Sequence, residues 1–184
     1  KRGGSGVRPL VVGTVLHRIA ARALCATFAS RMADATAPTQ FGSHKAAGGE
    51  KLHKIALSLT TTDLDLCVLS LDLSNAFQCV NRASLINETH RRLPQLLPWL
   101  RVILGEPAHI VMSTSDADPI HLTQTAGLRQ GCPLSPLLFA LDSSPIVEQL
   151  HHFTTDPTRK GYTLAYVDDV TCLVRAAHVS ETLE

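Results

Sequence analysis

Residues 165–171 read "AYVDDVT" and place two adjacent aspartates, Asp168 and Asp169, between two apolar runs. Both runs are short and rich in β-branched residues, a pattern typical of β-strands. Neighbouring side chains of a straight strand point to opposite faces, so two adjacent carboxylates can share one task only at a turn. Aspartate tolerates turn geometry well. The stretch therefore predicts a tight hairpin with Asp168 and Asp169 at its tip.

A third carboxylate, Asp72, stands near the end of a second apolar run, residues 67–73, which is predicted to be a buried strand. Two carboxylates about 4 Å apart repel by roughly 4 kcal/mol at an effective dielectric near 20. An isolated aspartate is usually a turn or cap residue, but a pair between apolar flanks needs a partner that offsets the repulsion. If strand and hairpin are neighbours, two Mg²⁺ ions, which prefer oxygen ligands, would be that partner and would support phosphoryl transfer.

Length and composition favour a single intracellular domain. With 184 residues, 45% of them hydrophobic, the chain fits one domain or a large fragment of one. No apolar run is long enough to span a bilayer, and no signal peptide opens the chain. The five cysteines are scattered without a C-x-x-C pair, which favours reduced core cysteines. We therefore expect a protein of the cytoplasm, the nucleus or both, with no membrane association.

The net charge of +1 hides an uneven distribution. Residues 1–60 carry nine Lys or Arg and two Asp or Glu, whereas the remainder is acidic overall. A basic first third joined to an acidic remainder suits a site that binds phosphates on one side and metal ions on the other. Ordinary variation among solvated surfaces explains the same numbers equally well.

Hydrophobic periodicity predicts three helices in the first half of the chain. The first runs from about Thr14 to Met32. Its expected inward stripe consists of Val12, Leu16, Ile19, Ala20, Ala23, Leu24 and Phe28. A second helix follows Gly48-Gly49, and Ser74 is expected to cap a third. The expected buried face of the third helix holds Ala76, Val80, Ala83 and Ile86.

The second half is predicted to begin with a short helix between Pro94 and Gly105, followed by a hairpin within residues 109–123. A long helix follows Pro133, and Pro145 inside it is expected to kink or interrupt it. Strands and helices alternate without a strict βαβ rhythm. We therefore expect an α+β domain with a mainly antiparallel sheet.

Three segments carry a family resemblance: "VLSLDLSNAFQCVNR", "GLRQGCPLSPLLFAL" and "YVDD", in this order along the chain. They resemble the palm motifs of reverse transcriptases, and "KRGGSGVRPL" and "QFGSHKAAGG" resemble the fingers segments that precede them. The SNAF and RQGCPLSPLLF wording is most similar to non-LTR retrotransposons, with group II intron enzymes as cousins. The resemblance covers nearly the whole chain.

The resemblance implies a right-hand polymerase fold, with part of the fingers in residues 1–62 and part of the palm in residues 63–184. The palm would hold a mainly antiparallel sheet flanked by helices. The sequence ends at Glu184, soon after the YVDD hairpin. We therefore expect the thumb to be absent and the chain to be a fragment of a longer polyprotein or a degenerate copy.

At matched positions the resemblance also implies a metal site. Asp72 and Asp168 would be the main metal-binding carboxylates, with Asp169 as the third member of the catalytic set and the backbone carbonyl of Leu73 as a further ligand. The ions would be two Mg²⁺, with Mn²⁺ as an alternative.

A second implied set binds the nucleotide and the template. Arg8 would clamp the triphosphate through its bidentate guanidinium, and backbone N–H groups of Asn75 and Ala76 would hold phosphate oxygens. Phe77 stands where the family has its aromatic sugar gate, which excludes a 2′-hydroxyl, and Gln130 would pack against the incoming nucleotide. Gly131 and Tyr166 would contact the template and primer, and either Lys1 or Arg2 would be the second triphosphate contact.

The implied function is RNA-directed DNA synthesis, in which an RNA template, a DNA primer and dNTPs are the partners. A degenerate or domesticated domain that binds RNA or a partner protein without catalysis is the alternative. An RNA-directed RNA polymerase is disfavoured by Phe77, because that position must be open for ribonucleotides. A sugar-nucleotide transferase would have to use Asp63 and Asp65 as its metal pair, and no nucleotide-binding loop accompanies them. Cys132 and Gln78 replace aspartates of many relatives, but neither position binds metal in the family.

Overall fold

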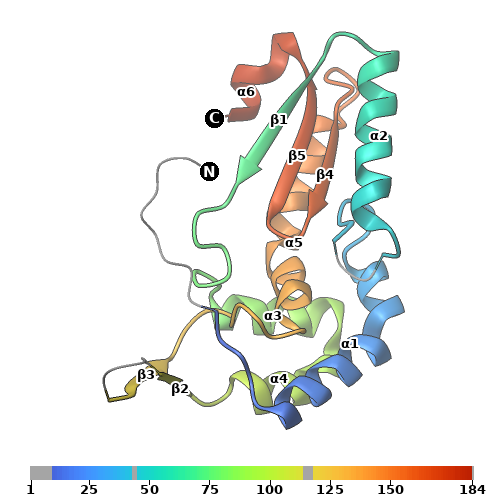
Figure 1. The fold of residues 1–184 in the computed structure, drawn as a ribbon. Coiled ribbons are helices and arrows are strands. Elements are labelled where there is room, and N and C mark those ends of the chain that lie inside the picture. Colours follow the sequence, from blue (N-terminus) through green and yellow to red (C-terminus); the bar gives the residue numbers. More distant parts are fainter. Residues whose placement is uncertain (1–9, 43–44, 114–117, 184) are drawn as a thin grey trace.

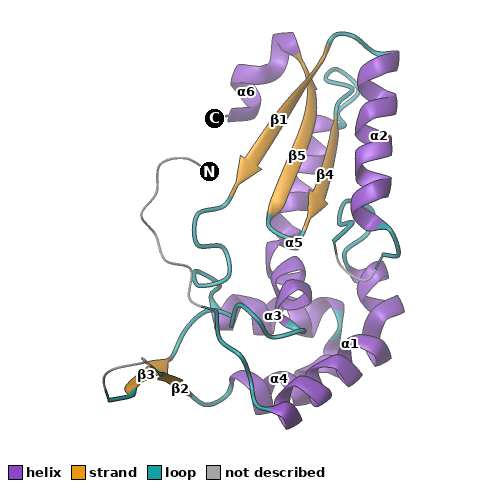
Figure 2. Cartoon of the chain, viewed as in Figure 1, coloured by secondary structure: helices purple, strands orange, loops and turns teal. Residues whose placement is uncertain are grey.

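The computed structural model describes residues 10–42, 45–113 and 118–183, and Figures 1 and 2 show their arrangement. The helical elements, in chain order, are α1 (Val15–Ala35), α2 (Gly48–Thr62), α3 (Arg82–Arg92), the 3-10 helix η1 (Pro94–Leu96), α4 (Leu97–Leu104), α5 (Ser135–Thr154), the 3-10 helix η2 (Ala176–His178) and α6 (Val179–Leu183). The strands are β1 (Leu66–Asp72), β2 (Ala108–Met112), β3 (Ile120–Gln124), β4 (Tyr162–Tyr166) and β5 (Asp169–Arg175).

A three-stranded antiparallel sheet of order β1-β5-β4 forms the centre of the fold. Figure 1 shows α5 behind this sheet and α2 alongside β4. Strands β2 and β3 form a separate antiparallel hairpin, as predicted. The expectation of an α+β fold with mainly antiparallel strands is therefore confirmed. The proposed boundary after residue 62 coincides with the end of α2, and the division into fingers and palm stays a prediction.

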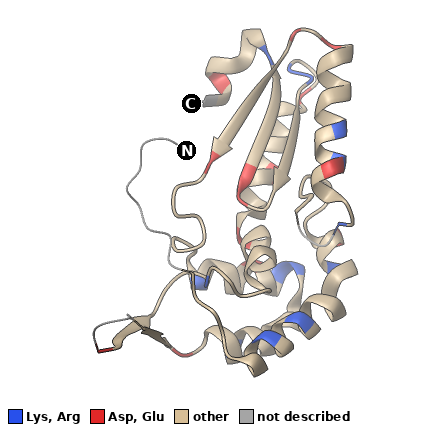
Figure 3. Cartoon of the chain, viewed as in Figure 1, with Lys and Arg blue, Asp and Glu red and all other residues tan. Residues whose placement is uncertain are grey.

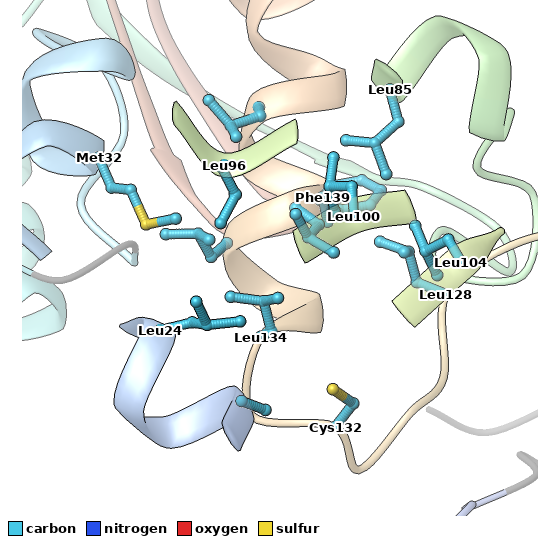
Figure 4. Packing of buried hydrophobic residues seen from close by; sticks show 14 of the residues in the cluster. Leu24, Met32, Leu85, Leu96, Leu100, Leu104, Leu128, Cys132, Leu134 and Phe139 are labelled. Carbon is cyan, nitrogen blue, oxygen red and sulfur yellow. The ribbon is translucent and has the colours of Figure 1, made fainter. Parts of the chain in front are cut away.

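Two hydrophobic clusters hold the fold together. The smaller one lies between the sheet and the second half of α5 and contains Val147, Ala165, Val170, Cys172 and Val174. The larger one joins α1, α3, α4 and the first half of α5 (Figure 4), with members that include Leu24, Met32, Leu85, Leu96, Leu100, Leu134 and Phe139. Each fully buried leucine contributes about 1.5–3 kcal/mol. Helix α5 belongs to both clusters and so connects the sheet to the helical part.

The predicted inward stripe of α1 is wrong in its first turns. Leu24 and Phe28 are buried as expected, together with Ala21 and Met32, whereas Leu16 is 79% exposed. Val12, Ile19, Ala20 and Ala23 are exposed as well. The buried stripe of α1 begins at Ala21 and continues at a spacing of three to four residues. The exposed apolar residues of α1 are out of register with this stripe, so they lie on another face of the helix.

The predicted start of the third helix is also wrong. Residues 74–79 form a run of turns, and α3 begins only at Arg82. Asn81 is its N-cap, since its side-chain oxygen accepts the N–H groups of Ala83 and Ser84 at 2.9 and 3.2 Å. Asn75 has a φ of 53°, a left-handed conformation that a helix cannot continue through. Leu85 and Thr89 are therefore buried in place of Ala83 and Ile86.

Pro145 does not interrupt the long helix. Helix α5 is continuous through it, although proline lacks the N–H that would bond the preceding turn, a loss of about 3 kcal/mol in a free helix. Leu138 on one side and Val147 on the other are both buried, so tertiary packing on both sides offsets this loss. Within residues 10–42, 45–113 and 118–183, no helix is long and apolar enough to cross a membrane.

Candidate active site

Asp72 and Asp169 are directly opposite each other in the antiparallel pair β1–β5. Directly opposed residues have Cβ atoms about 4.5–5.5 Å apart and share one face of the sheet. Figure 3 shows acidic positions on both strands at this end of the sheet. The register of the sheet therefore brings together two carboxylates that are far apart in the sequence.

The predicted hairpin is present, with one adjustment. Tyr166 pairs with Asp169, so Val167 and Asp168 form a two-residue turn between β4 and β5. Asp169 is thus the first residue of β5 rather than part of the tip. A tight turn of this kind needs a residue with positive φ at its first central position, and Val167 supplies it with a φ of 57°.

Val167 is an unusual residue for this conformation. A β-branched side chain at positive φ is a genuine outlier, and such strain amounts to about 1–3 kcal/mol. Strained residues of this kind concentrate at active sites, where surrounding contacts hold them in place. The turn that carries Asp168 is therefore maintained by its surroundings and not by local preference.

The carboxylates lie on the open face of the sheet. Val170, Cys172 and Val174 of β5 are buried on the face that packs against α5, so Asp169, which precedes Val170, points to the opposite face. Asp72 and Asp169 are both exposed, as is Tyr166. Solvent, metal ions and substrates can therefore reach this row of side chains.

The donor set fits a hard divalent cation. All three side chains offer carboxylate oxygens, the ligands that Mg²⁺ prefers. Within the part of the chain that the structure describes, no group of three or more His, Cys, Asp or Glu side chains is arranged to hold a metal ion by itself. Polymerase-type Mg²⁺ sites usually combine one or two carboxylates with water and substrate phosphates. Asp72 and Asp169, which lie opposite each other, could supply carboxylates in that number.

The segment after β1 runs from the open end of the sheet toward the helical core. Leu73 and Asn75 are exposed, whereas Ala76 is buried. The ring of Phe77 is half-buried and lies 5.3 Å from that of Phe139, centroid to centroid. The N–H of Leu128 donates to the carbonyl of Phe77 at 2.7 Å, so this segment is bound to the loop that precedes α5.

That loop also contacts the segment before α1. The N–H of Val11 donates to the carbonyl of Gln130 at 2.8 Å. Gly131 has a φ of 108°, and a Cβ at this position would lie 2.7 Å from the carbonyl oxygen of Val11. Glycine is therefore required at residue 131 by the fold itself. Gln130 also borders an open cavity of about 350 Å³ between this loop and the β2–β3 hairpin.

Burial shifts the pKa values of two groups on α1 that lie against this loop or near it. Burial, together with the charge of Arg129, lowers the pKa of His17 from its ordinary value. Burial and the neighbouring Cys132 raise the pKa of the Cys25 thiol to about 11. The imidazole of His17 lies 3.4 Å from the sulfur of Cys132. The contact between His17 and Cys132 therefore joins α1 to the loop before α5.

Comparison with known proteins identifies the family of this chain. A family model described as reverse transcriptase (RNA-dependent DNA polymerase) matches residues 1–183. The chain belongs to the reverse transcriptase family. It is also similar to the Transposon TX1 uncharacterized 149 kDa protein of Xenopus laevis, with 28% identity over 177 residues. These residues are 89% of this chain but 13% of that protein, so the chain spans a small part of its relative's length.

Solved telomerase structures share the fold of this reverse transcriptase domain. The apo telomerase of Candida tropicalis truncated from its C-terminal domain aligns with a TM-score of 0.59 at 12% identity, over 91% of this chain and 36% of the other. The Candida tropicalis telomerase in complex with a TWJ fragment of telomeric RNA gives 0.59 at 14% identity, over 92% and 30%. At these identities the likeness concerns the fold alone.

The residues singled out from the sequence of this reverse transcriptase domain fall into three groups. Asp72, Asp168, Asp169 and Tyr166 are brought together at one end of the sheet. Two loop segments, one directly after β1 and one before α5, are joined by the hydrogen bond from Leu128 to Phe77, and they hold Leu73, Asn75, Ala76, Phe77, Gln130 and Gly131. Arg8, Lys1 and Arg2 lie outside the described residues.

Sequence reasoning missed Gln40 and Gly42. Both contact the turn at Val167, and the side chain of Gln40 bonds to its backbone. The fingers-like segment "QFGSHKAAGG" contains both residues. Its likeness to the family, however, gave no indication that an amide there faces a turn far along the chain.

Proposed function

We propose that this chain is the core of an RNA-directed DNA polymerase from a non-LTR retrotransposon, which adds dNTPs to the 3′-hydroxyl of a primer. The observation that carries the proposal is the register of the sheet, which places Asp72 opposite Asp169 with Asp168 in the adjoining turn. Membership of the reverse transcriptase family supports the same activity. The RNA template, the DNA primer and the dNTPs are the proposed partners.

In this proposal the three carboxylates hold the cations and orient the triphosphate above the open face of the sheet. Two Mg²⁺ ions, or Mn²⁺ in their place, would lower the pKa of the primer hydroxyl and stabilise charge on the departing pyrophosphate. The O–H bond of the primer hydroxyl breaks and its proton passes to water. The new bond then joins the primer oxygen to the α-phosphorus, and the bond from that phosphorus to the pyrophosphate oxygen breaks. The carbonyl of Leu73 directly follows Asp72 and is the proposed additional ligand.

The neighbouring segments take the substrate-binding roles. Backbone N–H groups at Asn75 and Ala76 are proposed to contact phosphate oxygens, and Phe77 to lie below the sugar. Gln130 is proposed to face the nucleotide, since its loop is bonded to the segment that contains Val11. Gly131 and Tyr166 are the proposed contacts to template and primer, and Tyr166 is exposed beside Asp169.

Arg8 is proposed to contact the triphosphate, with Lys1 or Arg2 as its companion. Arg8→Ala should then raise the KM for dNTP more than it weakens template binding, because the guanidinium would bind a substrate phosphate. A fall in template affinity with an unchanged KM would make Arg8 a contact to the nucleic-acid backbone instead.

The test is Mg²⁺-dependent dNTP incorporation on a primed RNA template by the full-length protein that carries this chain. Asp168→Asn should abolish incorporation while the fold is retained, and Asp34→Asn, an exposed position on α1, is the matched control. Incorporation by Asp168→Asn at the wild-type rate would overturn the proposal. If the wild type binds primed RNA but incorporates nothing, the degenerate or domesticated RNA-binding domain is the correct alternative.

A further inference from the structure

We propose that Gln40 is a positioning residue for the catalytic hairpin: its side chain fixes the turn that carries Asp168. The geometric part of this inference stands on contacts within the chain. Its consequence for activity rests on the proposed function. The residues involved come from the segment after α1, residues 39–42, and from the turn between β4 and β5 (Figure 1).

The side-chain amide of Gln40 bonds both backbone groups of Val167. Its Oε1 accepts the N–H of Val167 at 2.8 Å, and its Nε2 donates to the carbonyl of Val167 at 3.3 Å. The same Oε1 accepts the N–H of Gly42 at 2.9 Å. Two N–H donors at one atom require that atom to be the oxygen, so the orientation of the amide is determined by its neighbours. Gln40 is only 3% exposed, so water does not substitute for these bonds.

The segment around Gln40 is aligned with the hairpin by backbone bonds. The N–H of Phe41 donates to the carbonyl of Ala165 at 2.7 Å, and the N–H of Ala165 donates to the carbonyl of Thr39 at 2.9 Å. Gln40 and Ala165 thus form a parallel bridge beside β4. This bridge fixes the backbone of Gln40 beside β4, so that its side-chain amide reaches the turn.

Gly42 allows the close contact. A Cβ at this position would lie 2.6 Å from a methyl carbon of Val167 and 2.7 Å from its backbone nitrogen. Any larger residue would push the segment away from the turn. The segment is therefore shaped to lie against Val167, the residue whose positive φ needs outside support.

The consequence reaches Asp168 through the peptide bond. The carbonyl of Val167 belongs to the planar peptide unit that ends at the Cα of Asp168. Fixing the direction of this carbonyl therefore fixes the position of the Cα of Asp168. Asp169 is held differently, by ladder pairing with Asp72 and Tyr166. Loss of the Gln40 amide should therefore displace Asp168 while the register at Asp169 is retained.

The first test is amide hydrogen exchange in the full-length protein that carries this chain. Gln40→Leu should speed exchange in peptides spanning residues 162–169 by at least about tenfold. Leu100→Ala, a fully buried position in the larger cluster, is the control for a general loss of stability. Hairpin exchange no faster in Gln40→Leu than in a Leu100→Ala protein of similar Tm would overturn the inference. This measurement does not depend on polymerase activity.

The second test separates positioning from substrate contact. Gln40→Leu should lower kcat on the order of a hundredfold, as displacements near 1 Å do, and leave the KM for dNTP and the affinity for primed RNA within about threefold. Adding Val167→Gly should recover part of kcat, because glycine adopts positive φ without support. Weaker RNA binding with an unchanged kcat would overturn the inference in favour of a nucleic-acid contact.

The two proposals fail in different ways. If the wild-type protein incorporates no dNTP, the proposed function fails, and the exchange measurement alone decides whether Gln40 holds the turn. If the wild type is active and Gln40→Leu retains the wild-type kcat, the positioning role fails and the polymerase proposal stands.

Discussion

Asp72, the last residue of β1, lies directly opposite Asp169, the first residue of β5. Like charges at directly opposed positions destabilise a sheet, and neither a turn nor a cap requires an acid at these two places. A cation bound between the two carboxylates would offset the repulsion between their charges. Sites at which local rules are broken in this way are expected to be functional.

Mg²⁺ should stabilise the folded protein through this pair. At ten times the dissociation constant, one bound ion adds about 1.4 kcal/mol to the free energy of unfolding, which corresponds to roughly 3–6 °C in Tm for a domain of this size. Asp169→Asn should reduce this shift strongly, because one carboxylate of the pair is lost. Thermal unfolding over a Mg²⁺ titration measures it, with Asp34→Asn as the control. An equal shift in wild type and Asp169→Asn would place the ion elsewhere.

Acid should lower the free energy of unfolding through the ion cluster that joins α3 and α5. Arg92 donates to both carboxylate oxygens of Glu148 at 2.7 and 2.6 Å and to Glu88 at 3.0 Å. The hydrogen bonds from Arg92 lower the pKa of Glu148 below the ordinary value of a glutamate, 4.5. A depressed pKa in the folded state contributes stability above the unfolded value, and this contribution is lost as pH falls through the folded value.

The free energy of unfolding should therefore decrease as pH falls from about 5 toward 3. Glu148→Gln should flatten this decrease and lower stability near neutral pH by about 1–3 kcal/mol, as expected for a hydrogen bond to a charged group. Glu50→Gln, in an exposed pair with Lys54, is the matched control. Urea unfolding at several pH values measures both effects. An unchanged pH profile in Glu148→Gln would show that this cluster does not control acid stability.

Cysteine labelling should follow burial and pKa. The pKa of Cys25, raised to about 11 by burial and by Cys132, leaves almost no thiolate near neutral pH. Cys79 is exposed. Iodoacetamide should therefore modify Cys79 at least about tenfold faster than Cys25 in the native protein, and mass spectrometry of digested samples over time measures the ratio. Equal rates would mean that the helical cluster opens readily.

The two hairpins and the long helix were predictable because their signals are local. Apolar runs with β-branched residues mark β4 and β5, and the aspartates between them mark the turn. The pairing of Asp72 with Asp169 could be expected only if the two elements were neighbours, since register across a sheet is decided by long-range packing and not by either strand. The same limit applies to Gln40, whose partner Val167 is 127 residues away.

The errors have local causes as well. Ser74 and Asn81 are both good N-caps, and the sequence alone does not choose between them. The left-handed backbone at Asn75 decides the choice, and it is visible only in the structure. In α1, the apolar residues Leu16 and Ile19 have the spacing expected of a buried stripe, but both are exposed in the structure. Periodicity predicts a helix more reliably than it predicts which face is buried.

Phe77 offers the sharpest test of DNA over RNA synthesis. Its ring is half-buried against Phe139, so it has both a packing role and the proposed contact with the sugar of the incoming nucleotide. Phe77→Val should lower stability by about 1–3 kcal/mol, less than a fully buried phenylalanine. It should also relax discrimination against ribonucleotides, because a smaller side chain leaves space for a 2′-hydroxyl. Phe77→Tyr should retain selectivity, since the ring keeps its bulk.

The control separates these two roles. Phe139→Leu removes the ring beneath Phe77 at a buried position, so it should lower Tm without changing sugar preference. The measurement is the ratio of kcat/KM for dNTP over rNTP in the Phe77 and Phe139 variants, together with their melting temperatures. If Phe77→Val lowers Tm as Phe139→Leu does and leaves the ratio unchanged, Phe77 is a packing residue only. A ratio that falls in Phe77→Val alone assigns it to the sugar, because loss of packing weakens the use of both nucleotides equally.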